Sequence, residues 1–195
     1  MSRLNHTGTV TLGTERLILR RFTMDDAQAM YENWASDPEV TKYLTWPTHE
    51  NVDVSALVLA DWVEHYAEAD YYQWAIVLKE TGAPIGSISV VHCNDQISKM
   101  EIGYCIGRQW WNCGMTSEVL GSVIRFLFEE VGVDRIEACH DSRNPNSGAV
   151  MCKCGMQYEG TQRQAGINNF GKCDLSWFAI LAEDWKKELL GDEEQ

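Results

Sequence analysis

The chain has 195 residues, of which 45% are hydrophobic and 23% charged, a composition typical of a globular protein with a sizeable core. Its formal net charge of −13 disfavours nucleic acid as a partner, because binding a phosphate backbone needs clustered Lys and Arg. The first thirteen residues lack the apolar stretch of a signal peptide, and no apolar run is long enough to cross a membrane.

The sequence contains no composition break that would divide it. We therefore expect a single domain over residues 1–195, with a core from about 14 to 181 and a charged C-terminal tail over 182–195. Seven cysteines without a secretion signal indicate reduced thiols and a cytoplasmic location. The pair Cys152 and Cys154 lacks Cys-x-x-Cys spacing, so we expect no metal.

The first half of the chain alternates between strand and helix patterns. The predicted elements, in order, are a strand over 17–22, a helix from Thr23 to Trp34, a helix over 52–69, and strands over 72–78, 85–92 and 100–106. Asp26 follows Thr23 at the spacing of a capping box, and Pro38 follows the end of the helix. Short turns between the three later strands predict an antiparallel meander.

The second half contains the strongest helical periodicity in the chain. This helix covers 116–131 and ends at Gly132; a strand over 135–140, a short helix over 147–153, and strands over 156–159 and 173–181 follow. Because a helix joins two neighbouring strands here, we expect a parallel crossover within an otherwise antiparallel sheet. The fold class is α/β (α+β) with three layers.

The segment 110–118 lies between a predicted strand and the strongest helix. Free N–H groups and the positive end of the helix dipole make such a position attractive to anions. Gly114 lets a ligand approach the backbone, and Thr116 or Ser117 offers a hydroxyl to a phosphate. The same hydroxyls are also ordinary helix caps, so the turn alone does not identify a ligand.

Five motifs in a fixed order carry a resemblance to a known family. They are Glu101-Ile102-Gly103-Tyr104, Trp111-x-x-Gly114-x-Thr116-x-Glu118, Asp134-Arg135-Ile136-Glu137-Ala138, Asn144-x-x-Ser147 and Gly155-Met156-x-x-Glu159-Gly160. From about residue 14 to 181 the sequence resembles the GNAT N-acetyltransferases, in particular the branch that acetylates N-termini of ribosomal proteins. The resemblance implies a mixed, mostly antiparallel sheet of about six to seven strands with helices on both faces. The sheet splays between its fourth and fifth strands, here 100–106 and 135–140.

The resemblance also implies a site for acetyl-CoA, with its pantetheine arm in the splay and its pyrophosphate on the turn. The residues implied are Cys105, Ile106, Trp111, Asn112, Cys113, Gly114, Met115, Thr116, Ser117, Asn144 and Ser147. The turn departs from the superfamily pattern Gln/Arg-x-x-Gly-x-Gly/Ala, because Trp111 stands at its first position and Thr116 at its last.

Transfer from a thioester requires an uncharged amine and a proton for the departing sulfur. By resemblance, Ser147 donates that proton and Glu101 removes the proton of the amine, with Glu159 as the second candidate base. The alternatives are local: Asn144 or Ser147 as a helix cap, and Glu101 as a solvated residue at a strand end. A free amine also reacts without any protein base. In the loop before the second helix, we expect Trp46 to contact the acceptor, because such loops carry binding residues.

The resemblance thus implies an enzyme that moves acetyl from acetyl-CoA to a primary amine, by direct attack in a ternary complex. The acceptor is a protein N-terminus or a small-molecule amine, and the enzyme is a monomer or a homodimer. The alternative is a regulatory or sensory module that binds acyl-CoA without turnover. Ser147 and Glu101 argue against it, because a binding module needs neither.

Overall fold

One eight-stranded sheet runs through the part of the chain that the structure describes. The structure is a computed structural model and describes residues 4–192. The strand order is β1-β2-β3-β4-β5-β6-β8-β7, with bounds β1 Leu12–Gly13, β2 Leu17–Arg20, β3 Gln73–Leu78, β4 Pro84–Asn94, β5 Lys99–Ile106, β6 Arg135–Asp141, β7 Gln157–Asn168 and β8 Gly171–Leu181. Neighbours are antiparallel except β5 and β6, which are parallel. The predicted mixed sheet with one parallel crossover is confirmed.

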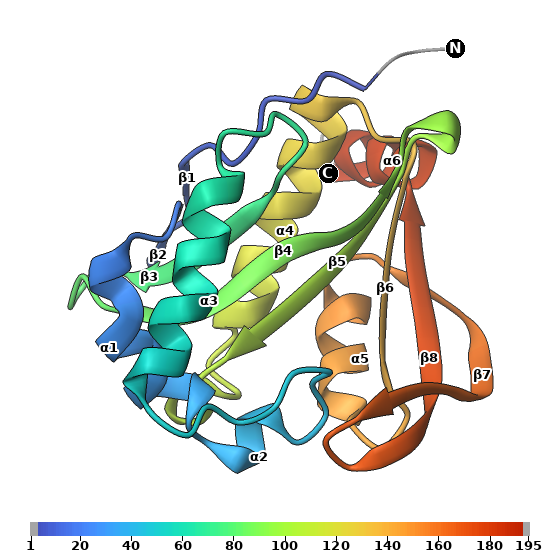
Figure 1. The fold of residues 1–195 in the computed structure, drawn as a ribbon. Helices are drawn as coiled ribbons and strands as arrows, with labels where there is room; N and C mark the ends of the chain where they lie inside the picture. Colours follow the sequence, from blue (N-terminus) through green and yellow to red (C-terminus); the bar gives the residue numbers. More distant parts are fainter. Residues whose placement is uncertain (1–3, 193–195) are drawn as a thin grey trace.

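Helices cover both faces of this sheet. Their bounds are α1 Ala27–Met30, α2 Pro38–Thr41, α3 Val52–His65, α4 Met115–Phe126, α5 Pro145–Lys153 and α6 Ala182–Asp192. Figure 1 shows α1 and α3 on one face and α4 on the other. Within residues 4–192, no helix combines the length and the apolar character needed to span a membrane.

The alternation of side chains along β3 explains the three layers. Trp74 and Ile76 point into the core that α4 covers, and Ala75 and Val77 point into the core that α1 and α3 cover. All four are at most 5% exposed. A strand that is apolar on both faces is stable only when both faces are covered.

The strand count exceeds the expected six to seven because β1, a strand of two residues, pairs with β2. Strand β7 is also much longer than the predicted 156–159. It lies at the sheet edge and most of its residues are exposed, so it lacks the apolar alternation by which a half-buried strand is found.

The predicted helix from Thr23 to Trp34 is divided. A 3₁₀ turn precedes α1, and a π-helical turn over Tyr31–Ala35 follows it. The capping prediction holds in part, because the Asp26 carboxylate accepts the Thr23 N–H at 2.8 Å. A period of 3.6 residues does not reveal a turn closed by the Ser36 N–H on the Tyr31 carbonyl, a bond that spans five residues.

Two further boundaries differ from the predicted ones. Helix α3 ends at His65 instead of residue 69. The predicted tail forms α6, in which the Trp185 ring lies 6.1 Å from that of Phe128. The charged composition of this segment gave no indication that Trp185 would contact Phe128.

The pairing of β5 with β6 is short. It covers Lys99↔Arg135, Met100↔Ile136 and Glu101↔Glu137. Beyond these three pairs β5 continues to Ile106 and β6 to Asp141, and Figure 1 shows the two strands moving apart. The predicted splay is confirmed, and Glu101 lies in the last pair before it.

Gly86 of β4 provides a stability test at this part of the sheet. A Cβ on Gly86 would lie 2.3 Å from the carbonyl oxygen of Cys105 and 2.8 Å from the Cα of Ile106. We expect Gly86→Ala to lower the free energy of unfolding by roughly 1–3 kcal/mol, the usual cost of overpacking. Urea denaturation measures this.

Gly121→Ala is the matched control. Gly121 lies in α4, and a Cβ there would have no heavy atom within 4 Å. Alanine is the better helix former, so this variant should gain about 0.5–1 kcal/mol. A loss of stability in both variants would contradict the steric explanation.

Candidate functional site

A cleft of about 1140 Å³ opens where β5 and β6 diverge. It extends from the turn before α4, past β5 and the start of α5, to residues 39–45 and the β7–β8 hairpin. The sequence-predicted residues that line it are Glu101, Cys105, Ile106, Trp111, Asn112, Gly114, Thr116, Ser117, Asn144 and Ser147. Cys113, Met115 and Trp46 are not part of this lining.

The turn before α4 has the backbone geometry of an anion cradle. Asn112 and Gly114 both adopt left-handed φ values, 59° and 75°. Gly114 is the N-cap of α4, so the helix begins without a capping side chain. Thr116 and Ser117 therefore lie in the first helical turn and face the cleft, and the capping role considered for them is not realised.

Trp111 fixes the start of this turn. Its indole N–H donates to the carbonyl of Ile106 at 2.9 Å, which ties the turn to the end of β5. The side chain remains 39% exposed and lines the cleft. At the position where the superfamily pattern has Gln or Arg, this chain thus carries an aromatic that braces the backbone.

The three predicted residues outside the lining have other contacts. Cys113 is exposed, and its carbonyl accepts from Arg16 at 2.9 Å. Met115 packs against the larger core. Trp46 packs beside His49, with ring centroids 5.3 Å apart, while its neighbours Leu44 and Thr45 line the cleft. Cys113 and Met115 still contribute backbone N–H groups to the turn.

Ser147 faces the cleft from the first turn of α5. Its hydroxyl is 3.0 Å from the Tyr104 hydroxyl, which also donates to the Ser147 carbonyl at 3.0 Å. Asn144 is the N-cap of α5, and no side-chain hydrogen bond caps the helix there. Asn144 thus occupies the N-cap position considered for it but makes no capping side-chain bond, and Ser147 is not a cap. Burial raises the pKa of Tyr104, so its hydroxyl stays protonated.

Glu101 occupies the closed end of the cleft. Its pKa is raised, first by burial and then by the nearby charge of Glu137. The Cys139 thiol lies 3.8 Å from the Glu101 carboxylate, and burial together with Glu101 raises the pKa of that thiol to about 12. Glu101 is thus a partly desolvated carboxylate inside the cleft, not a solvated strand end.

Glu159 has a different environment. The Arg135 guanidinium binds it through two bonds of 2.8 and 2.5 Å, and this pairing lowers the pKa of Glu159. It lines a separate, smaller cavity. These contacts are those of a structural ion pair.

The part of the cleft lined by residues 39–45 and the β7–β8 hairpin is held together by polar contacts. Arg143 binds Asp141 at 2.6 Å and, more than any other contact, lowers the pKa of that carboxyl to about 2. Asn168 donates to the same carboxylate at 2.7 Å. Asn169 donates to the carbonyls of Thr41 and Trp46 at 2.9 and 2.7 Å, so the β7–β8 hairpin is joined to the loop after α2.

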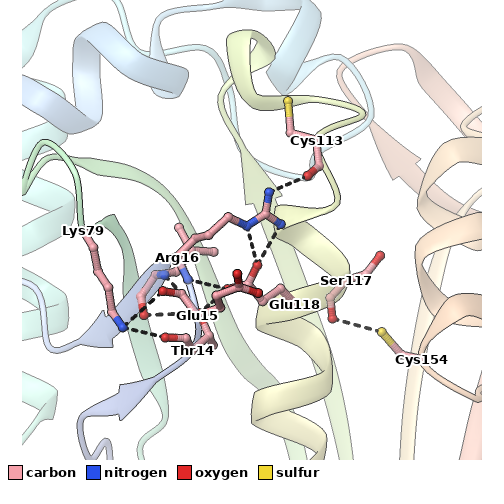
Figure 2. Close-up of polar contacts among 9 residues, drawn as sticks. Thr14, Glu15, Arg16, Lys79, Cys113, Ser117, Glu118 and Cys154 are labelled. Carbon is pink, nitrogen blue, oxygen red and sulfur yellow. Dashed lines mark hydrogen bonds and ion pairs between the residues drawn. The ribbon is translucent and has the colours of Figure 1, made fainter.

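Several neighbours of the site were missed by sequence reasoning. Tyr104 belongs to the motif Glu101–Tyr104 but has no predicted role, and the sequence predicts no role for Arg16 or Lys153. The Arg16 guanidinium and the Lys153 ammonium lie 3.6 and 4.0 Å from the place of a Cβ on Gly114. Figure 2 shows Arg16 between Glu118 and Cys113. No local pattern reveals these contacts, because they join segments far apart in the sequence.

A cluster of metal-ligand atoms lies outside the cleft. Ligand atoms of His6, Cys93 and Asp95 come within 4.8 Å of one another. His6 approaches Asp95 at 3.3 Å, and the Cys93 thiol donates to Asp95 at 3.2 Å. Hydrogen bonding accounts for this grouping.

The comparisons with known proteins agree with this geometry. The family profile described as acetyltransferase (GNAT) domain matches residues 16–157. An uncharacterized N-acetyltransferase, YoaA of Bacillus subtilis, is 31% identical over 170 residues, which cover 87% of this chain and 96% of that protein. The [ribosomal protein uS5]-alanine N-acetyltransferase of Escherichia coli is 27% identical over 84 residues, 43% of each chain.

Solved structures share the fold. A probable acetyltransferase of the GNAT family from Chromobacterium violaceum superposes with a TM-score of 0.82 at 22% identity, covering 95% of this chain and 93% of that one. The ribosomal-protein-S5-alanine acetyltransferase of Vibrio fischeri gives 0.79 at 18% identity, with 90% and 98% covered. The splayed sheet, the turn before α4 and the family match together establish that the chain belongs to the GNAT family and is an N-acetyltransferase.

Proposed function

We propose that this N-acetyltransferase transfers acetyl from acetyl-CoA directly to an uncharged primary amine, with both substrates bound at once. The acceptor is a peptide N-terminus or a small-molecule amine. One observation carries the proposal: the cleft between β5 and β6 is lined at one end by the anion-binding turn and at the other by Glu101, with Ser147 on its wall. The cleft thus combines a donor site with groups able to move two protons.

The donor end suits a long molecule with phosphates. Acetyl-CoA, when bound, supplies an activated acetyl thioester. The N–H groups at the start of α4 face the anion position, and Gly114 leaves room for its close approach. The β5 residues Cys105 and Ile106 line the middle of the cleft, beyond the last pair with β6, where an extended arm can lie against the backbone.

Glu101 is suited to remove the proton of the amine. A general base is effective when its pKa lies close to the working pH, and burial moves Glu101 in that direction. Its carboxylate reaches the acceptor directly or through one water. Glu137 raises the pKa further without competing for the acceptor, because Glu137 is bound by Lys99 and Arg135.

Ser147 is suited to supply a proton to the departing sulfur. A serine hydroxyl is a weak acid, so a donor behind it helps. Tyr104 is such a donor, since its protonated hydroxyl lies 3.0 Å from the Ser147 oxygen. The Tyr104 O–H, which donates to the Ser147 carbonyl before the reaction, turns to the Ser147 hydroxyl oxygen and stabilises it by a hydrogen bond as the serine proton moves to the sulfur.

The first prediction concerns binding and turnover. Isothermal titration should give a dissociation constant for acetyl-CoA between about 1 µM and 1 mM, the usual range for enzyme substrates. Adding amines or peptides to the same sample should release free thiol. Binding without thiol release for any acceptor would favour a sensor module, and absence of binding would overturn the proposed function.

The acceptor panel separates the two substrate classes. It contains peptides with free N-termini, the same peptides with blocked N-termini, polyamines and free amino acids. Thiol release with free but not blocked peptides assigns a peptide N-terminus, whereas release with polyamines or amino acids alone assigns a small-molecule amine.

The second prediction concerns Glu101→Gln. Because the glutamate works as a base only when ionised, the wild-type kcat/KM should rise with pH through the raised pKa of Glu101 and fall in acid. The variant should lose about 10²- to 10⁴-fold in rate and also lose this acidic limb. Initial rates of thiol release between about pH 5 and pH 9 measure both effects.

Glu159→Gln is the matched control, since Glu159 is ion-paired outside the cleft. Its rate and pH profile should stay close to those of the wild type. An equal loss in both variants, or an unchanged acidic limb in Glu101→Gln, would contradict the assignment of the base.

The third prediction separates chemistry from binding at Ser147. Ser147→Ala should lower kcat about 10- to 100-fold while the dissociation constant of acetyl-CoA changes less than about twofold. Tyr104→Phe should give a smaller loss of kcat, because the serine hydroxyl remains. A Ser147→Ala variant with unchanged kcat, or with binding lost in parallel, would remove the proton-donor role.

A further inference from the structure

The turn that receives the donor phosphates needs external support. Asn112 and Gly114 both have positive φ, a conformation that Asn and Gly tolerate better than other residues but do not enforce. No side chain caps the start of α4 at Gly114. The sequence of the turn therefore permits this geometry, and contacts from elsewhere in the chain must hold it.

Arg16 makes contacts that can hold the turn in place. Its Nη1 donates to the Cys113 carbonyl at 2.9 Å, and its Nε and Nη2 lie 2.8 and 2.7 Å from Oε2 of Glu118. Figure 2 shows the guanidinium spanning the turn and the first turn of α4. Arg16 immediately precedes β2 and is 97 residues from Cys113 in sequence. A planar guanidinium can hold two partners in a fixed relation.

The segment that carries Arg16 is itself anchored. The Thr14 hydroxyl donates to Oε1 of Glu118 at 2.5 Å, and the Arg16 N–H donates to the same oxygen at 2.9 Å. Lys79 donates to the Thr14 carbonyl at 2.6 Å. Glu118 therefore accepts hydrogen bonds at both carboxylate oxygens, and Arg16 has little freedom to move.

The peptide between Cys113 and Gly114 is oriented by this contact. In a trans peptide the carbonyl and the following N–H point in opposite directions. With the Cys113 carbonyl held on Arg16, the Gly114 N–H points away from Arg16. Asn112 and Gly114 line the cleft, whereas Cys113 and Arg16 do not. The bond to Arg16 thus turns the N–H toward the side where the phosphates bind.

The charge of Glu118 also affects the phosphate site. Burial disfavours ionisation of Glu118, but hydrogen bonds from Thr14 and Arg16 outweigh it and lower the pKa of Glu118. A carboxylate one turn from a phosphate site repels the ligand unless it is neutralised. Arg16 supplies the neutralising charge, and Lys153 adds a cation on the cleft side of Gly114.

We propose that Arg16 is a positioning residue for the donor: it fixes the Cys113 carbonyl and neutralises Glu118, so that the turn presents N–H groups and no unpaired carboxylate to the phosphates of acetyl-CoA. The inference rests on the proposed donor site and assigns a role to a residue outside the turn.

The test measures the dissociation constant of acetyl-CoA by isothermal titration for the wild type, Arg16→Ala, Arg16→Lys and Arg16→Ala/Glu118→Gln. Arg16→Ala should bind at least about tenfold more weakly, because charge-assisted bonds are lost and Glu118 is left unpaired. Arg16→Lys should fall between, since it keeps the charge but not the planar fork. The double variant should recover part of the loss, because the unpaired carboxylate is gone.

Arg20→Ala is the matched control. Arg20 also binds a carboxylate through two bonds, those to Asp26 at 2.7 and 2.8 Å, but it does not line the cleft. Its affinity for acetyl-CoA should stay within about twofold of the wild type. Thermal unfolding of every variant, compared with this control, separates loss of binding from loss of folding.

A shortened donor distinguishes a role at the phosphate site from a general structural role. A general structural role would lower kcat/KM equally with both donors. S-acetylpantetheine lacks the pyrophosphate and the nucleotide, so Arg16→Ala should change its kcat/KM by less than about twofold. Equal losses with both donors would overturn the proposal, as would wild-type affinity of Arg16→Ala for acetyl-CoA. A double variant no better than Arg16→Ala would overturn the part assigned to Glu118. Failure of the wild type to bind acetyl-CoA would instead overturn the proposed function.

Discussion

The early end of pairing between β5 and β6 is the constraint on which the site depends. Parallel neighbours ordinarily satisfy each other's backbone groups along their length, yet here the register stops at Glu101↔Glu137. The backbone groups beyond that pair face the cleft, where water or a ligand must satisfy them. The separation also sets the order of the site, since Glu101 lies at the closed end and the turn before α4 at the open end. Without the splay, neither the cavity nor this order would exist.

Three glutamates illustrate how surroundings decide the use of a carboxylate. Glu101 lines the cleft, and burial raises its pKa. Both properties suit a base. Arg135 holds Glu159 in an ion pair, which suits structure. Glu118 is saturated by Thr14 and Arg16 and becomes part of the support of the turn. The residue type is the same in each case, and only tertiary contacts separate the roles.

The sequence predicted the elements with strong periodicity, and these are also the elements that build the sheet and α4. It predicted the splay through the resemblance, and most of the site residues predicted from motifs on β5, the turn and α5 do line the cleft. Features that do not follow from apolar periodicity were not predicted. The edge strand β7 has no apolar alternation, the π-helical turn after α1 breaks the helical period, and α6 is anchored by one tryptophan. The support by Arg16 and the Tyr104–Ser147 pair join distant segments, for which a single sequence contains no signal.

The contact of Asn169 with the loop after α2 has a mechanical consequence. Its two side-chain hydrogen bonds, together with that from its own N–H to the Leu44 carbonyl at 3.2 Å, tie the hairpin tip to a segment that precedes it by more than a hundred residues. These three hydrogen bonds connect two segments that line the cleft. Movement of the hairpin tip away from the loop after α2 therefore requires all three hydrogen bonds to break.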